Sequence, residues 1–295
     1  MRSWLFAPGD DEKKLAKAYG CSADIVIVDL EDSVAASGKA DARRCALAFL
    51  QETAQNRAGA QRFVRINAFA TGLADADLDA VMTGAPDGIV LPKAAGGGDI
   101  MALDGKIAVR EALHDITDGS TKIAAIATET AAAIFGLGTY ARASARLAAL
   151  TWGGEDLATD IGASANRDDG GAWTGPFQLA RNLCLFGSAA AGLAAIDTVF
   201  TNFRDDAGLA AECQAAARDG FAGKLAIHPT QVPIINAAFT PSAEALARAS
   251  RVVAAFAAAG DAGVVGLDGE MLDQPHLKAA QNLLARAASA EGDKD

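Results

Sequence analysis

Residues 25–32 read Ile-Val-Ile-Val-Asp-Leu-Glu-Asp, and this stretch decides how the chain folds. Four β-branched apolar residues in succession predict a strand that is buried on both faces, as is typical of parallel sheets covered by helices. The acids that follow place negative charge where this strand ends. The stretch therefore predicts a buried parallel strand with an acidic carboxyl end.

Similar apolar runs recur along the chain, and segments of helical period such as Asp41–Gln55 and Asp205–Gly220 separate them. The other predicted strands are Ser3–Ala7, Phe63–Ile66, Gly88–Leu91, Ile123–Ala127, Ala148–Trp152, Ala195–Phe200 and Lys224–Ile227. Alternating strands and helices indicate parallel strands with helical crossovers. Eight repeats favour an α/β fold of the TIM (β/α)8 barrel type, which needs about 250 residues.

The end of the chain extends beyond such a barrel. We expect residues 1–240 to form the barrel and residues 241–295 to form a C-terminal helical extension that is not an independent domain. Ser242 can cap a helix that runs to about Ala259. A glycine- and aspartate-rich segment, Gly260–Gly269, with a small apolar patch follows, and a last helix begins near Gln274.

Composition excludes several classes of function. The chain is 51% hydrophobic and 21% charged, which is enough apolar material for a large core, and its net charge is −11. Such a charge repels nucleic acid and anionic membrane surfaces. We see no signal peptide and no apolar stretch long enough to cross a bilayer. A cytoplasmic protein without nucleic-acid or membrane partners is expected.

Two acids at strand ends are the most informative candidates for a site. Glu129 and Asp156 are 27 residues apart (156 − 129), about one strand–helix repeat, so they should end neighbouring strands. Carboxylates that close repel each other unless a proton or cation lies between them, and Mg²⁺ is the cation that suits oxygen ligands of this kind. The alternative is a pair of rim carboxylates in salt bridges with Arg65 or Lys93.

Charged residues at two other strand ends have open roles. Glu31 and Asp32 could orient metal-bound water, or one of them could cap the following helix. Arg65 lies in an apolar run and must be paired if it is buried. It could bind a substrate carboxylate bidentately, or it could neutralise Glu129.

A glycine pair follows the sixth strand, at residues 153 and 154. Glycines let a backbone approach a ligand closely and leave the next amides free to donate, although an ordinary tight turn needs glycine too. We expect substrate contacts from Gly154, Glu155, Asp156 and Leu157. The polar loop at 160–175 should lie on the same face.

The strand-end segments together resemble the citrate lyase β-subunit-like branch of the HpcH/HpaI aldolase superfamily. The segments that carry the resemblance run in order from residue 2 to residue 273: Arg2–Gly9, Val28–Val34, Val64–Asn67, Val90–Lys93, Thr128–Thr130, Trp152–Leu157, Gly223–Gln231 and Leu267–Asp273.

This resemblance implies a TIM barrel that assembles as a homotrimer or hexamer. It implies Mg²⁺ bound by Glu129 and Asp156, with Arg65 gripping the substrate near its carbonyl. It also implies a lyase that cleaves or forms the carbon–carbon bond of a 3-hydroxyacyl thioester, such as malyl-, citramalyl- or citryl-CoA. The products of cleavage would be acetyl-CoA and a 2-oxo acid. Asp268, supplied by a neighbouring subunit, would be the acid/base on the acetyl carbon. The base for the hydroxyl is open between Glu31, Asp32 and a metal-bound water.

Three alternatives remain at this stage. The first is an aldolase on free hydroxy-oxo acids, although such members of the superfamily place a histidine base near the second strand, where this chain has acids. The second is a thioesterase of the malyl-CoA type. The third is a non-catalytic barrel that binds a metabolite.

Overall fold

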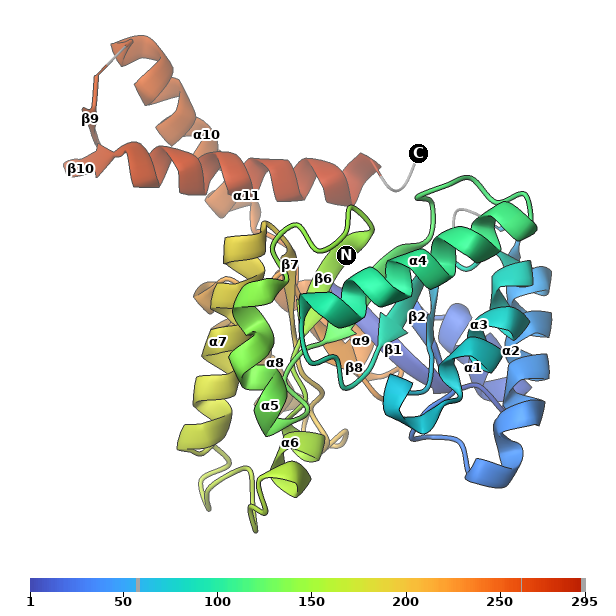
Figure 1. Ribbon diagram of the computed structural model, residues 1–295. Helices are drawn as coiled ribbons and strands as arrows, with labels where there is room; N and C mark the ends of the chain where they lie inside the picture. Colours follow the sequence, from blue (N-terminus) through green and yellow to red (C-terminus); the bar gives the residue numbers. More distant parts are fainter. Residues whose placement is uncertain (57–58, 261, 293–295) are drawn as a thin grey trace. The chain divides into compact units, whose positions relative to one another are not determined.

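The computed structural model describes residues 1–56, 59–260 and 262–292. The chain divides into two compact units, Met1–Ala237 and a second that begins at Ala238. In the first unit, eight parallel strands close into a barrel in sequence order, and the expected TIM barrel is confirmed (Figure 1). The strands are β1 (Ser3–Pro8), β2 (Ile25–Asp29), β3 (Gln61–Arg65), β4 (Gly88–Leu91), β5 (Lys122–Ile126), β6 (Leu147–Thr151), β7 (Ala194–Asp197) and β8 (Gly223–Ala226).

Helices connect consecutive strands and, with a further helix after the last strand, cover the outside of the barrel (Figure 1). They are α1 (Glu12–Tyr19), α2 (Lys39–Thr53), α3 (Ala74–Val81), α4 (Gly97–Leu113), α5 (Ala131–Gly136), α6 (Gly154–Asp160), α7 (Gly175–Ala191), α8 (Asp206–Asp219) and α9 (Gln231–Phe239). Short 3₁₀ helices occur at η1 (Ala36–Gly38), η2 (Phe69–Thr71), η3 (Met82–Gly84) and η4 (Leu137–Thr139). Side-chain caps fix where several helices begin: Asp11 for α1, Thr130 for α5 and Asp205 for α8.

Side chains alternate between the barrel interior and the helices, as the strand period of two requires. The interior is a single apolar cluster: Trp4, Ile25, Ile27, Phe63, Val90, Ala124, Ile126, Ala149, Ile196 and Leu225. Two residues beyond Ile27 and Phe63, the same inward rows reach Asp29 and Arg65. The alternation therefore places this acid and this base in the interior layer above the apolar core.

The seventh strand is shorter than the sequence predicts. It ends at Asp197 rather than Phe200, because its pairing with β8 ends there. The carbonyl of Phe200 instead accepts a hydrogen bond from the side chain of Gln231, at 2.8 Å. Residues 198–203 thus form a loop at the carboxyl end of the barrel.

The second unit has its own elements and its own core. It contains α10 (Ala243–Ala259), the antiparallel pair β9 (Val264–Leu267) and β10 (Glu270–Asp273), and α11 (Gln274–Gly292). Ser242 caps α10 as expected, by accepting from the N–H of Ala245. The core of this unit is Ala249, Val252, Phe256, Val265, Leu272 and Ala280.

The hairpin of β9 and β10 was not expected from the glycine-rich segment. Its turn residues, Asp268 and Gly269, have φ of +54° and +82°. Two left-handed residues in succession are the geometry of a type I′ turn, which favours tight hairpins and the Asp-Gly pair. The two strands bury Val265 and Leu272 against α10 and α11.

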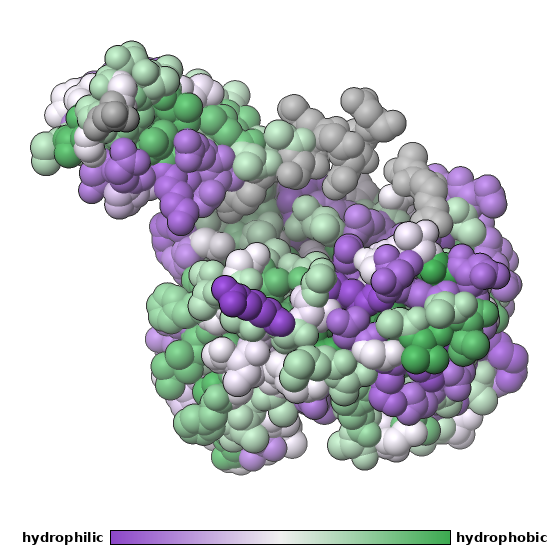
Figure 2. All heavy atoms as spheres, turned by 45° about the horizontal axis from the view of Figure 1, so that its top comes forward, coloured by the Kyte–Doolittle hydropathy of each residue, from purple (hydrophilic) through white to green (hydrophobic). Residues whose placement is uncertain are grey.

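Hydrophilic and hydrophobic residues are interspersed over the face of the barrel unit shown in Figure 2. Scattered apolar residues are normal on protein surfaces. Among the described residues, none of the helices has both the length and the apolar character that a bilayer crossing needs.

Candidate active site

A cavity of about 410 Å³ opens at the carboxyl ends of the strands. Its floor is apolar, and its wall carries both acidic and basic side chains. The residues that line it come from seven of the eight strand ends: Phe6, Ala7, Pro8, Asp29, Asp32, Ser33, Arg65, Ile126, Glu129, Trp152, Gly153, Gly154, Glu155, Asp156, Thr198, Val199, Leu225 and Ile227. Glu129, Asp156, Arg65 and Asp32, all predicted from the sequence, thus share one cavity.

Arg65 is held in place by Asp29. Strand register sets the two residues side by side. Nε and Nη2 of Arg65 each donate to one oxygen of Asp29, both at 2.7 Å. Burial alone would raise the pKa of Asp29, but the hydrogen bonds and charge of Arg65 lower it below its usual value. The bidentate face of Arg65 is therefore used within the protein. The charge of Arg65 also interacts with that of Glu129, and its contact with substrate stays a prediction. The guanidinium lies over the ring of Phe6, 4.7 Å from the ring centroid.

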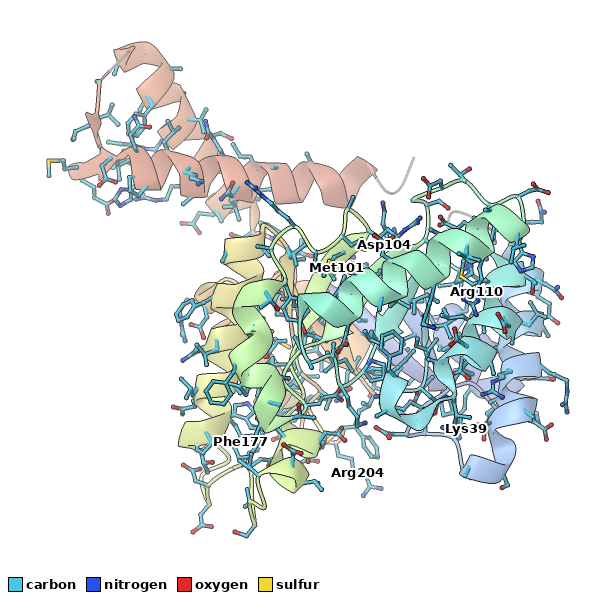
Figure 3. All side chains as sticks on the ribbon, in the orientation of Figure 1. Lys39, Met101, Asp104, Arg110, Phe177 and Arg204 are labelled. Atoms are coloured by element: carbon cyan, nitrogen blue, oxygen red, sulfur yellow. The ribbon has the colours of Figure 1, made fainter. Side chains whose placement is uncertain are left out.

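Glu31 and Asp32 lie in a turn that Asp29 organises. The carboxylate of Asp29 accepts from the backbone N–H groups of Glu31 and Ser33, at 2.9 and 3.1 Å. Lys39, labelled in Figure 3 near the start of α2, donates to the carbonyls of residues 30 and 31 at 2.7 and 2.8 Å. Neither acid caps α2, whose N-cap is Gly38 with no side-chain hydrogen bond. Both acids face the basic groups of the site.

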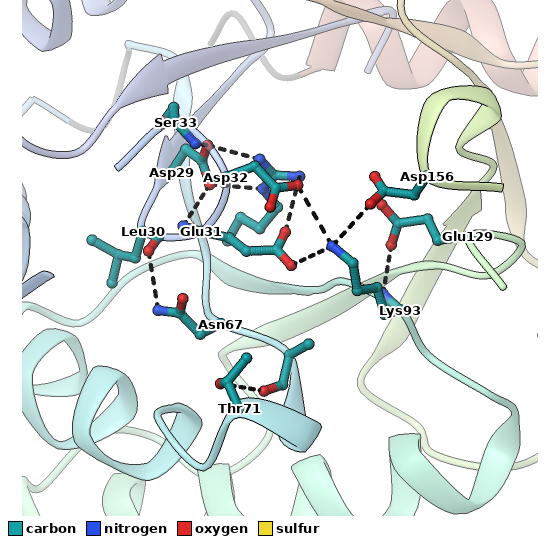
Figure 4. A network of polar contacts seen from close by, with 12 residues as sticks. Asp29, Leu30, Glu31, Asp32, Ser33, Asn67, Thr71, Lys93, Glu129 and Asp156 are labelled. Atoms are coloured by element: carbon teal, nitrogen blue, oxygen red, sulfur yellow. Dashed lines mark hydrogen bonds and ion pairs between the residues drawn. The ribbon is translucent and has the colours of Figure 1, made fainter. Parts of the chain in front are cut away.

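Lys93 joins the acids of the second strand to those of the fifth and sixth (Figure 4). Its Nζ lies 2.7 Å from Glu31 Oε1, 3.3 Å from Asp156 Oδ1 and 3.5 Å from Asp32 Oδ2. Its backbone N–H donates to Glu129 Oε2. The salt-bridge alternative for Asp156 is therefore present in the structure, and Lys93 is a member of the site.

Glu129 is a buried acid that forms no salt bridge among the described residues. It is 3% exposed, and burial together with the nearby carboxylate of Asp156 raises its pKa to about 8. No ion pair links it to a basic side chain within the ranges that the structure describes, and its hydrogen-bond donor is the backbone of Lys93. A hard divalent cation suits such a carboxylate pair.

The chemistry of this donor set fits Mg²⁺ with few protein ligands. No group of three or more His, Cys, Asp or Glu side chains in the described parts of the chain is arranged to hold an ion. Mg²⁺ is commonly bound by one or two carboxylates, with water and substrate as its other ligands. Glu129 and Asp156, both on the cavity wall, meet that requirement.

The glycine pair serves the protein's own packing. A Cβ on Gly153 would lie 2.7 Å from Cγ of Glu129, and one on Gly154 would lie 2.9 Å from the ring of Trp173. The glycines therefore make room for these two side chains, which the sequence analysis did not foresee. Gly154 also begins α6, which carries Glu155 and Asp156 at the cavity, whereas the predicted contact residue Leu157 is buried and does not line it.

A buried charge network supports this wall of the cavity, and the sequence analysis missed it. Lys224, fully buried, donates to Asp197 at 2.8 Å and to Glu212 at 2.7 Å. Asp197 accepts from the indole of Trp152 at 2.7 Å, and Glu212 accepts from Arg167 in the 161–174 loop at 2.8 Å. The sequence did contain a signal for this network, namely Lys224 and Asp197 within apolar strands. Charged side chains that are buried in such strands must be paired.

Asp268 lies in the second unit, in the turn between β9 and β10, where its carboxylate is hydrogen-bonded to Arg251. It is therefore not among the residues that the barrel unit brings together.

A closed (β/α)8 barrel with a charged cavity at the strand carboxyl ends defines the chain as a TIM-barrel protein with an enzyme-like site. Residues 2–229 match the model of the HpcH/HpaI aldolase/citrate lyase family, and the chain belongs to this family.

Three similar proteins refine this assignment. The (3S)-malyl-CoA thioesterase of Cereibacter sphaeroides is 36% identical over 97% of this chain and 94% of its own length. The mitochondrial citramalyl-CoA lyase of Rattus norvegicus is 32% identical over 98% of this chain and 86% of its own. The crystal structure of CitE from Mycobacterium tuberculosis, in complex with magnesium, acetoacetate and coenzyme A, matches with a TM-score of 0.77 and 33% identity, over 97% of this chain and 98% of that one. The expected family and the expected enzyme class, a carbon–carbon lyase, are confirmed.

Proposed function

We propose that this protein is an Mg²⁺-dependent lyase that cleaves or forms a carbon–carbon bond of a 3-hydroxyacyl-CoA thioester, such as malyl-, citramalyl- or citryl-CoA. The products of cleavage would be acetyl-CoA and a 2-oxo acid. The observation that carries the proposal is that Glu129, Asp156 and Arg65 line one cavity at the mouth of the barrel. The names of the relatives and the ligands of CitE support the substrate class.

Glu129 and Asp156 would hold the metal. When bound, Mg²⁺ supplies positive charge that lowers the pKa of a coordinated hydroxyl and balances the two carboxylates. The protein keeps Glu129 in position through the backbone of Lys93 and through the space left by Gly153.

Arg65 would stabilise the oxyanion that develops on the thioester carbonyl. Two of its five N–H groups donate to Asp29, and Nη1 lies 3.1 Å from Glu31. About two N–H groups are left for a substrate oxygen, and their orientation is fixed in advance by the bonds to Asp29. Donors preorganised in this way are worth about 3–4 kcal/mol in the transition state.

Asp32 lines the cavity and Glu31 does not, but burial raises the pKa of Glu31, which favours Glu31 as the residue that takes the hydroxyl proton. Glu31 is 5% exposed and is held by both Lys93 and Arg65. The Asp32 carboxylate is 55% exposed, so its position is less constrained. We assign Glu31 as the base and Asp32 as a supporting charge.

Gly154, Glu155, Asp156 and Leu157 would contact the substrate, a prediction that rests on the glycine pair and that the place of the first three on the cavity wall supports. The role of Asp268 rests on the family resemblance. Asp268 of a neighbouring subunit, in a homotrimer or hexamer, would protonate the acetyl carbon or deprotonate it in the condensing direction. Its place at a hairpin tip, 46% exposed, suits a residue that reaches another molecule.

Product analysis tests the proposal. The protein is incubated with acetyl-CoA, Mg²⁺ and glyoxylate, pyruvate or oxaloacetate in turn, and the thioesters are identified by mass spectrometry. We expect condensation with at least one acid, and loss of it in Glu129→Ala and Asp156→Ala. Full Mg²⁺-dependent activity in either variant would contradict the assignment of the metal ligands.

Thioester hydrolysis is the second candidate, because a relative at 36% identity is named a malyl-CoA thioesterase. The same assay with malyl-CoA separates the two, since a lyase gives acetyl-CoA and glyoxylate whereas a thioesterase gives malate and free CoA. The aldolase alternative is less well supported, because the residues that line the described cavity include no histidine.

A further inference from the structure

The charge of the Lys93 ammonium has no function yet in the proposed reaction beyond its contact with Glu31. Lys93 follows β4, and it meets both halves of the acidic cluster: its ammonium contacts Glu31, Asp32 and Asp156, and its backbone N–H contacts Glu129 (Figure 4). Three carboxylates thus surround one ammonium group, within 2.7–3.5 Å of its nitrogen.

The backbone of Lys93 is held in a conformation that side-chain-bearing residues avoid. Its φ is +52°, in the left-handed region. In that conformation the N–H points to Glu129 while the side chain reaches Glu31 and Asp156. Strained residues persist where the surrounding structure fixes them, and they concentrate at functional sites.

The ammonium lies among the carboxylates that attract a divalent cation. It is 3.3 Å from Asp156, one of the two proposed metal ligands, and 2.7 Å from Glu31, the proposed base. Two cations that share one set of carboxylates repel each other, and each weakens the attraction of the set for the other.

We propose that Lys93 is an internal counter-cation: its ammonium balances the acidic cluster when the metal is absent, competes with Mg²⁺ for Asp156, and stays on Glu31 to position it when the metal binds. This inference rests on the proposed function, because it takes Glu129 and Asp156 as the metal ligands. It makes Lys93 a positioning residue that also sets the affinity for the metal.

The variant Lys93→Met tests this proposal, since it removes the positive charge and keeps most of the length of the unbranched side chain. Mg²⁺ affinity is measured by isothermal titration calorimetry without substrate, and turnover is measured at saturating Mg²⁺. We expect Mg²⁺ to bind at least tenfold more tightly and kcat to fall about tenfold with little change in KM. A general loss of structure would not strengthen metal binding.

Three further variants make the result decisive. Lys93→Arg keeps the charge and should bind Mg²⁺ within about threefold of wild type, and Lys93→Gln replaces Lys93→Met if that variant does not fold. Lys106→Met is the matched control, because Lys106 pairs with Asp75 on the surface, at 2.8 Å, away from the cavity. Unchanged or weaker Mg²⁺ binding without the Lys93 charge would overturn the competition, and unchanged kcat would overturn the positioning role. If wild type itself binds no Mg²⁺, the proposed function fails, and this inference fails with it.

Discussion

Replacing Asp29 by asparagine should damage both the fold and the reaction, because Asp29 makes the bidentate contact that orients Arg65. The pair is bidentate, with both contacts at 2.7 Å, and both residues are buried. Each Asp29 oxygen accepts from one nitrogen of Arg65 and from one backbone N–H, that of Glu31 or that of Ser33. Asparagine removes the charge and turns an N–H₂ group toward one such pair of donors. Breaking a buried ion pair from one side costs about 3–5 kcal/mol of stability.

The effect on turnover follows from the position of Arg65. If the guanidinium loses its anchor, its free N–H groups no longer face the developing oxyanion, and kcat should fall about 10²–10³-fold. Stability is measured by urea unfolding, and turnover by the condensation assay at saturating Mg²⁺.

A matched control separates the two effects. Arg62, on the same strand as Arg65, pairs with Asp87 at the opposite end of the barrel, with Nε–Oδ2 and Nη2–Oδ1 distances of 2.9 and 3.3 Å. Asp87→Asn should lower stability while leaving kcat within about threefold. If Asp29→Asn keeps wild-type turnover, or if both variants lose it equally, the assigned role of Arg65 is refuted.

The same variant has a signature in pH. Although burial opposes it, Arg65 lowers the pKa of Asp29 in the folded protein. The pair therefore stabilises the fold above the unfolded pKa of about 3.9, and this contribution is lost as the pH falls through the lower folded value. Asp29→Asn should flatten the acid side of the stability–pH curve.

Three further predictions concern the metal site and its support. Burial raises the pKa of Glu129 to about 8, so Mg²⁺ must displace a proton from this carboxyl at lower pH. The Mg²⁺ affinity should therefore rise about tenfold per pH unit from pH 6 to 8 and then level off. Calorimetry should detect proton release on binding, and binding without proton release would contradict this prediction. Gly153→Ala places a Cβ 2.7 Å from Cγ of Glu129 and should weaken Mg²⁺ binding at least tenfold, whereas Gly105→Ala, with nothing within 4 Å, should leave it unchanged. Lys224→Met leaves the buried Asp197 without its main partner and should cost about 3–5 kcal/mol in urea unfolding, and a loss below 1 kcal/mol would show that the pair is not structural.

The barrel could be predicted because its determinants are local. Continuous apolar runs such as Ile25–Val28 mark strands that are buried on both faces, and the residues that follow them must lie at one rim. Glu129 and Asp156 were found by that argument alone, and the structure places both at the cavity.

The salt bridge between Lys93 and Asp156 was one of the predicted alternatives. The other partners of the site residues could not be predicted, because they depend on register between strands and on backbone conformation. Asp29 meets Arg65 because β2 and β3 pair in one particular register, which neither strand specifies alone. Lys93 reaches both Glu31 and Glu129 because its φ is positive, a state that its residue type does not suggest.

The hairpin of the second unit is a different case, because its signal was present in the sequence. Asp268 and Gly269 form the dipeptide that type I′ turns favour, and Val264–Leu267 precedes it as a short strand. The high glycine content of the segment obscured the alternation.

The metal site is tested most directly by a crystal of the protein grown with Mn²⁺, which carboxylate sites bind in place of Mg²⁺ and which scatters anomalously. We predict one strong anomalous peak in the cavity, about 2.1 Å from one oxygen of Glu129 and one of Asp156. A peak bound elsewhere, or a cavity in which these carboxylates hold no ion at saturating Mn²⁺, would contradict the account.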